Sequence, residues 1–144
     1  MRVTLGLRGD YAVRAMLALA SLEADGHPVS VPWIAARMGI PVRFLPQVMA
    51  DLGRAGLVVG TTGRSGGYRL ARSADAVTVL EVVEAVEPDE IRRCVLRGGP
   101  CRPDGRCAVH DLFTSATDAL RTALAARTLR ELADAGNLGA LLAP

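Results

Sequence analysis

The stretch "IPVRFLPQVMADLGRAG" (residues 40–56) and the segment "LVVGTTGRSGGYRLAR" (residues 57–72) that follows it decide the fold. The first stretch has one apolar face at helical spacing and is predicted to form a helix. That face contains Phe44, Leu45, Val48, Met49 and Leu52. Proline is tolerated in the first turn of a helix but not further inside, so Pro46 predicts a helix start near Val42 or Arg43.

The second segment is predicted to form a β-hairpin, because two short strands at residues 57–61 and 68–71 flank a glycine-rich tip. Gly63, Gly66 and Gly67 allow the backbone to bend sharply there or to approach a partner closely. Upstream, "VPWIAARMG" (residues 31–39) is predicted to be a short helix that ends at Gly39. Two helices joined by a tight turn and followed by a hairpin are the element order of a winged helix-turn-helix.

Further helices are predicted on both sides of this unit, at residues 7–24, 78–87, 109–127 and 128–136, the second and fourth of which begin with capping boxes. The long helix at 109–127 has an apolar stripe that a small domain cannot cover alone, which favours a partner subunit. The stripe contains Leu112, Phe113, Ala116, Ala119, Leu120, Ala123 and Leu124. The expected fold class is mostly α with a small β-hairpin wing. Residues 1–75 would form the winged helix-turn-helix, and residues 76–144 a cysteine loop and a long C-terminal dimerisation helix.

The second helix of the pair and the hairpin carry residues typical of a surface that binds double-stranded DNA. Arg43 and Gln47 are four residues apart, on one predicted helix face, and Arg and Gln are the usual partners of guanine and adenine. The candidate DNA-binding residues are Arg43, Gln47, Arg54, Thr62, Arg64, Ser65 and Arg69. The alternative is that these are ordinary surface residues. We favour DNA, because they gather on the two elements that would face it.

Composition narrows the function further. The chain of 144 residues has no lysine; residues 1–75 hold nine arginines against five acids, and residues 76–144 hold eight against ten. The positive first half indicates an anionic partner. Only five aromatic residues occur, which disfavours a protein that stacks single-stranded bases. The sequence shows no phosphate loop, nucleophile elbow, membrane-spanning run or secretion signal, so we expect a cytoplasmic protein that is not an enzyme.

All three cysteines lie in "CVLRGGPCRPDGRCAVHD" (residues 94–111), at Cys94, Cys101 and Cys107. An odd number of cysteines without a secretion signal argues against a disulfide framework. A loop rich in Gly, Pro and Arg has no apolar face to bury them, so they are predicted to serve metal or redox chemistry. Thiolates select iron–sulfur clusters or zinc. His110 would complete a zinc set, although these cysteines are spaced more widely than those of most structural zinc sites.

The whole chain resembles the IscR/NsrR/RirA-type regulators, bacterial winged-helix transcription factors that sense state through an iron–sulfur cluster. The resemblance runs from "MRVTLGLRGDYAVRAML" (residues 1–17) through the two segments quoted first to the cysteines and "TLRELADA" (residues 128–135). It implies a homodimer, held by the long helix, that binds operator DNA as a repressor. It also implies that Cys94, Cys101 and Cys107 ligate a 2Fe–2S or 4Fe–4S cluster, through which the protein would sense redox state or nitric oxide.

Three cysteines leave one coordination position of the cluster for another residue. His110 follows Cys107 in the pattern C-x2-H, at a place where the iron–sulfur biogenesis branch uses a His. Asp10 stands where the nitric-oxide-sensing branch uses an Asp from the partner subunit. Each has another interpretation: His110 could cap the long helix, and Asp10 could pair with Arg14, four residues later. We favour Asp10, because a ligand at the start of the first helix would couple the cluster to the DNA-binding half.

The chain departs from this family at three places. Six residues separate Cys94 from Cys101, where the most similar branches have five. Pro46 and Thr62 stand where the iron–sulfur biogenesis branch has an acidic residue and an arginine. The wider cysteine spacing bears on the geometry of the cluster. Pro46 and Thr62 bear on the preferred DNA sequence, although Arg64 could take over the role of the missing arginine in the wing.

Overall fold

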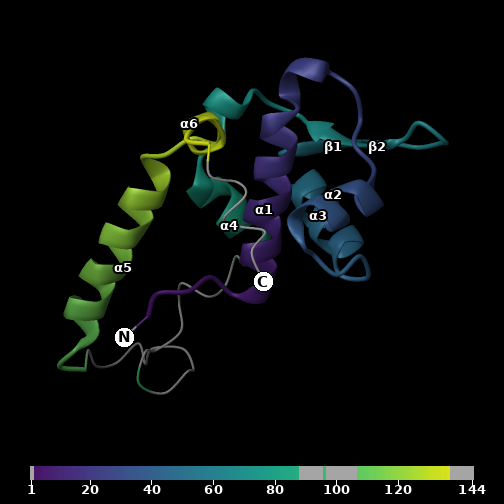
Figure 1. Ribbon diagram of the computed structural model, residues 1–144. Helices are drawn as coiled ribbons and strands as arrows, with labels where there is room; N and C mark the ends of the chain where they lie inside the picture. Colours follow the sequence, from purple (N-terminus) through teal and green to yellow (C-terminus); the bar gives the residue numbers. More distant parts are fainter. Residues whose placement is uncertain (1, 88–95, 97–106, 137–144) are drawn as a thin grey trace.

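Helix α1 (Leu7–Ser21) passes through the centre of the structure, and the other elements surround it (Figure 1). The computed structural model describes residues 2–87, 96 and 107–136 of the chain. Ala12 and every residue from Ala15 to Ala20 are buried, so burial extends around more than one face of the helix. The small alanines permit this, because α2 and α3 approach α1 on one side while α4 and α6 approach on the other.

The predicted helix pair is confirmed as α2 (Val31–Met38) and α3 (Leu45–Arg54), and a short 3-10 turn, η1 (Glu23–Asp25), separates it from α1. The Ser30 hydroxyl caps α2 by accepting a hydrogen bond from the Trp33 backbone N–H at 3.3 Å. Helix α3 begins at Leu45, later than predicted, and Pro46 lies in its first turn. The side of α3 that faces the core contains Leu45, Val48, Met49 and Leu52.

The predicted hairpin is a two-stranded antiparallel sheet of β1 (Val58–Thr61) and β2 (Gly67–Leu70). The register pairs are Val58–Leu70, Val59–Arg69, Gly60–Tyr68 and Thr61–Gly67. A further backbone segment joins this sheet, because the N–H groups of Val29 and Tyr68 each donate to the other residue's carbonyl at 2.8 Å. This bridge anchors β2 beside the start of α2, while the tip of the hairpin projects as a wing (Figure 1).

After β2 the chain forms a 3-10 turn, η2 (Ala74–Ala76), followed by α4 (Val79–Val86), α5 (His110–Ala125) and α6 (Leu129–Asp134). Both predicted capping boxes are confirmed, one at the start of α4 and one at the start of α6. No residue of α5 is buried, and this helix lies on the opposite side of the molecule from the wing (Figure 1). It contacts α4, where Arg121 forms an ion pair with Glu84.

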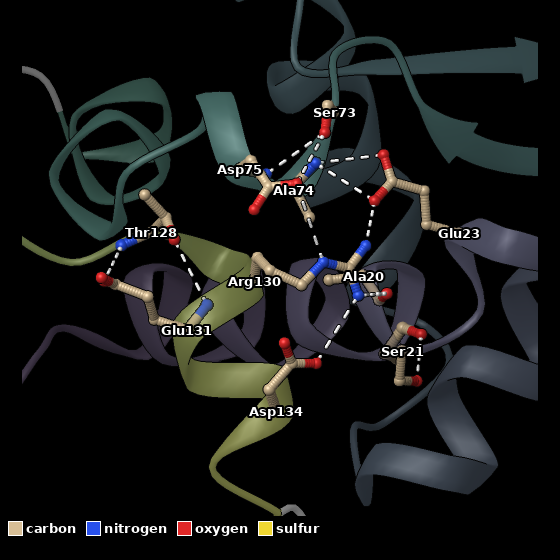
Figure 2. Close-up of polar contacts among 11 residues, drawn as sticks. Ala20, Ser21, Glu23, Ser73, Ala74, Asp75, Thr128, Arg130, Glu131 and Asp134 are labelled. Atoms are coloured by element: carbon tan, nitrogen blue, oxygen red, sulfur yellow. Dashed lines mark hydrogen bonds and ion pairs between the residues drawn. The ribbon is translucent and has the colours of Figure 1, made fainter.

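Arg130 of α6 fastens the end of the described chain to the winged helix-turn-helix (Figure 2). Its guanidinium forms an ion pair with Glu23 and donates to the Ala20 carbonyl at 3.4 Å. The Glu23 carboxylate also accepts from the Ala74 N–H, with oxygens at 3.1 and 3.3 Å. Because the neighbouring Leu129 is fully buried, α6 joins the same core as α1.

The expected fold class is confirmed, since the described residues are mostly helical with one two-stranded wing. Among these residues no helix is both long and apolar enough to cross a bilayer. Of the three cysteines, Cys107 belongs to the described residues, whereas Cys94 and Cys101 lie outside them, as does the apolar tail at residues 137–144.

Candidate nucleic-acid interface and metal site

Positive charge without a compensating acid gathers on the helix pair and the wing. Within residues 2–75, the arginines that form no ion pair with a described residue are Arg2, Arg37, Arg43, Arg64 and Arg69. Four of the five acids in the same segment do form ion pairs, and the exception is Asp25. The uncompensated arginines other than Arg2 belong to the helix pair, its turn and the hairpin, which project from the same side of α1 (Figure 1).

A buried carboxylate on α3 holds two of the candidate DNA-binding residues in place. Asp51 is only 9% exposed, and it forms ion pairs with Arg54 and with Arg8 of α1. The Gln47 amide donates to the same carboxylate at 3.2 Å. Gln47 and Arg54 therefore lie on the exposed side of α3 with their side chains tethered to Asp51. Helical spacing from Gln47 and Arg54 could have pointed to Asp51, but no local pattern indicates Arg8.

Arg43 lies in the turn before α3, so the prediction that it shares a helix face with Gln47 is wrong. Pro46 accounts for the difference, because the helix accepts a proline in its first turn and starts at Leu45. The Arg43 guanidinium lies over the Phe44 ring, 4.7 Å from its centroid, and Phe44 stacks on Tyr11 of α1 with centroids 6.2 Å apart. This stack holds Arg43 at the N-terminal end of α3, the end that helix-turn-helix proteins direct at base edges.

The wing tip presents Thr62, Arg64 and Ser65, all of them exposed, and Arg69 is exposed on β2. The wing is held in place by a close backbone approach at Gly67. The φ of Gly67 is +151°, and a Cβ at this position would overlap the Val29 carbonyl. Only glycine therefore allows the bridge between Val29 and Tyr68 to form without distortion.

Cys107 and His110 belong to one turn at the start of α5, where the His110 N–H donates to the Cys107 carbonyl at 3.0 Å. The Cys107 thiol is exposed and His110 is half-buried. Within the described part of the chain no three His, Cys, Asp or Glu side chains are grouped to hold a metal. An accessible thiol with an imidazole in the same turn nevertheless fits the soft donor set of an iron–sulfur cluster or a zinc ion.

Asp10 forms an ion pair with Arg14, one turn later on α1, which is the alternative role that the sequence suggests. The Arg14 Nε donates to Asp10 at 2.9 Å, and this hydrogen bonding raises the pKa of the guanidinium above its ordinary value. Arg14 also donates to the Met38 carbonyl at 3.0 Å, and its guanidinium lies 5.6 Å from the Tyr11 ring centroid. The Asp10 side chain is 38% exposed, so its carboxylate is ion-paired and still accessible.

Comparison with known protein families gives a match over most of the chain. Residues 5–135 match the Rrf2 family, described as iron-dependent transcriptional regulators. Over 133 residues the chain is 40% identical to the putative HTH-type transcriptional regulator ORF2 of Azotobacter vinelandii, which covers 92% of this chain and 79% of that protein. It is 38% identical to the HTH-type transcriptional regulator IscR of Escherichia coli, with coverage of 92% and 80%.

Solved structures agree with the sequence relatives. CymR, the global cysteine regulator of B. subtilis, superposes with a TM-score of 0.76 at 27% identity and covers 92% of this chain and 98% of its own. T. potens IscR gives a TM-score of 0.75 at 29% identity, with coverage of 94% and 90%. The sequence relatives are named as transcriptional regulators and not as enzymes, which confirms the expectation from the sequence.

Proposed function

Since the chain belongs to the Rrf2 family of transcriptional regulators, we propose that it is a homodimeric repressor whose binding to operator DNA is controlled by an iron–sulfur cluster. The observation that carries the DNA half of this proposal is the uncompensated charge of Arg37, Arg43, Arg64 and Arg69. Phosphate groups attract such arginines, and no carboxylate of the described residues forms an ion pair with them. Repression of transcription also places the protein with the DNA, in the cytoplasm.

The exposed side of α5 supports the homodimer. The apolar residues of α5 divide into two sets: Phe113 and Leu124 are half-buried, whereas Leu112 and Leu120 are exposed by 67% and 42%. The exposed set continues through Ala116, Ala119 and Ala123. A second copy packed on this strip would remove it from water, and the two-fold axis would present two α3 helices to the two half-sites of a palindromic operator.

In the proposed cluster site, Cys94, Cys101 and Cys107 supply the thiolate ligands. A cluster held there supplies reversible redox and ligand-exchange chemistry. The segment that contains Cys94 and Cys101 follows α4 in the sequence, and the end of α4 contacts the start of α1. Glu87, the residue after α4, accepts a hydrogen bond from the Gly9 N–H at 2.8 Å. The segment with these two cysteines therefore begins next to a contact with α1.

Asp10 is proposed as the fourth ligand, contributed across the dimer, because its contacts reach the DNA-binding elements. Arg14 connects Asp10 to the Met38 carbonyl at the end of α2 and to the ring of Tyr11. Tyr11 in turn stacks on Phe44, beside Arg43. If the carboxylate left Arg14 for the cluster, the contacts that position α2 and the turn before α3 would change. His110 is the alternative ligand, favoured by its place in the same turn as Cys107.

A second candidate function is a thiol-redox or zinc-stabilised regulator that uses the same three cysteines. It is favoured by the structural similarity to CymR, which is named a global cysteine regulator, and by the exposure of the Cys107 thiol. A visible absorption spectrum of the anaerobically purified protein separates the two candidates. A brown protein with cluster absorption supports the first, and a colourless protein supports the second.

The DNA half of the proposal predicts different losses for two arginine variants. Arg43→Ala is expected to relax the preference at one operator base per half-site, at a cost of about 1–3 kcal/mol if the contact is bidentate. Arg64→Ala is expected to weaken binding to all sequences and to lower the salt slope by about 1, as for a phosphate contact. Fluorescence anisotropy titrations against matched and scrambled operators at several salt concentrations measure both effects.

Arg127→Ala is the matched control for these variants, because Arg127 is an exposed arginine between α5 and α6 that also lacks an ion pair with a described residue. We expect it to bind both DNA sequences like the wild type. Unchanged affinity in Arg43→Ala and Arg64→Ala alike would remove these residues from the interface. Equal losses in all three variants would show an effect of net charge alone.

The fourth ligand is tested by Asp10→Asn and His110→Ala, prepared anaerobically. Asparagine keeps an acceptor for Arg14 but is a much poorer ligand than a carboxylate, so Asp10→Asn should alter the cluster spectrum and speed cluster loss in air. Arg14→Met is the control, because it breaks the same ion pair while keeping the carboxylate. We expect Arg14→Met to retain the wild-type spectrum. If His110→Ala disrupts the spectrum and Asp10→Asn does not, the histidine is the ligand.

A further inference from the structure

An open groove lies between the wing tip and the start of α2. Its walls come from the turn after η1, from the first turn of α2 and from the tip of the hairpin. The residues that matter to its chemistry are His27, Pro28, Ser30, Trp33, Arg64 and Ser65. The bridge between Val29 and Tyr68 fixes one wall against the other, so the groove is held open by backbone hydrogen bonds.

Trp33 is the most unusual residue in this groove, because the only tryptophan of the chain is 41% exposed there. The same helix buries Ile34, Ala35 and Met38 on its opposite side. The indole N–H has no hydrogen-bond partner among the residues that the structure describes. A large ring with a free donor, kept at the surface where it adds nothing to the core, is typical of a contact residue in an interface.

The side of the groove formed by the wing tip favours an anionic occupant. Arg64 enters the lining from the wing, and no described carboxylate forms an ion pair with it. Among the described lining residues Asp25 is the single acid, and it comes from the turn η1 on the side opposite the wing tip. The hydroxyl groups of Ser30 and Ser65 are further polar groups at its edges. The lining therefore combines an aromatic ring, an arginine and hydroxyl groups, which together suit a sugar–phosphate chain.

We propose that this groove binds the sugar–phosphate backbone of the operator, outside the bases that α3 would read. Trp33 packs its ring on a deoxyribose and donates its N–H to a phosphate, while Arg64 neutralises the neighbouring phosphate. This inference rests on the proposed DNA-binding function. The groove lies between the wing and the first helix of the pair, the helix that crosses the backbone in helix-turn-helix complexes.

The lone tryptophan makes the test direct, because all indole fluorescence of the protein comes from Trp33. We expect duplex operator to change this fluorescence and to protect it from quenching by acrylamide. We also expect Trp33→Ala to lose about fivefold to tenfold in affinity for matched and scrambled duplexes alike, with an unchanged salt slope. Trp33→Phe, which keeps a ring but not the donor, should show a smaller loss. Because Trp33 lies outside the core, neither variant should unfold the protein.

Val59→Ala is the control, because it truncates an exposed apolar side chain on β1 that is not part of the groove lining. It should leave the affinity unchanged. The groove does not bind the DNA backbone if Trp33→Ala binds operator with wild-type affinity and operator leaves Trp33 of the wild type equally accessible to acrylamide. The proposed function would still stand in that case. A fluorescence response to deoxynucleoside monophosphates but not to duplex would also overturn this role of the groove, in favour of a small-ligand site. Failure to bind any duplex would sink the proposed function itself.

Discussion

Gly67→Ala is expected to lower the free energy of unfolding by about 3 kcal/mol or more and to abolish tight operator binding. Two penalties add at this position. The φ of +151° is strained for any residue with a side chain, and the new Cβ would overlap the Val29 carbonyl and lie 2.8 Å from the Ser30 nitrogen. Those atoms are backbone, so they cannot rotate away as a side chain could. The bridge between Val29 and Tyr68 must break or shift, and the wing with it.

Gly63→Ala separates the cost of backbone strain at positive φ from the cost of Cβ overlap with neighbouring backbone atoms. Gly63 lies at the wing tip with a φ of +104°, and a Cβ there would meet nothing within 4 Å. It should cost only the strain, about 1–3 kcal/mol, and leave the anchor of the wing intact. Urea unfolding followed by far-UV circular dichroism gives the stabilities, and anisotropy titration gives the operator affinities. Equal effects of the two substitutions on both measurements would show that the close approach at Val29 does not hold the wing.

Most of the fold could be predicted from the sequence because its signals are local. The capping boxes at Thr78 and Thr128 define helix starts through residues three positions apart, and both were placed correctly. The strands of the wing agree with the prediction to within one residue, since glycines and alternating residues mark its ends. The start of α3 was harder, because Pro46 could occupy more than one position of a first turn.

The arrangement around the candidate interface could not be predicted, because it depends on contacts between distant segments. Asp51 is buried on α3 and receives Arg8 from α1, a pairing that no local spacing encodes. The stack of Arg43, Phe44 and Tyr11 likewise joins α1 to the turn before α3. The sequence identified the arginines, but only the structure shows which of them are tethered to acids and which are not.

The candidate metal site shows the same division between local and distant signals. The spacing C-x2-H correctly indicates that Cys107 and His110 are close, because both lie in the turn that opens α5. No local spacing decides between His110 and Asp10, which we propose to act across a dimer, and Asp10 carries an ion pair that a ligand role would have to replace. That ion pair is also what gives Asp10 its contact, through Arg14, with the end of α2.

Cys107→Ala is expected to remove the cluster and to change operator affinity by about fivefold to 150-fold, while the protein stays a folded dimer. The Cys107 thiol is exposed just before the N-terminus of α5, and the turn there is closed by the backbone hydrogen bond from the His110 N–H rather than by the cysteine side chain. Removing the sulfur should therefore change the stability of the apo protein by no more than about 0.5 kcal/mol. Cys101→Ala is expected to remain a folded dimer in the same way.

The decisive comparison is between Cys107→Ala and wild-type protein from which a chelator has removed the cluster. If the cluster is the switch, both should bind the operator alike, and both should differ from the cluster-loaded wild type. A thiol-redox regulator would behave differently, because the apo wild type would respond to oxidants whereas Cys107→Ala would respond less or not at all. Equal operator affinity in loaded, stripped and substituted protein would show that the cluster, if present, does not control DNA binding. The contacts from Asp10 through Arg14 to Met38 and Tyr11 would then only stabilise the packing of α1 against α2 and would not be part of a switch.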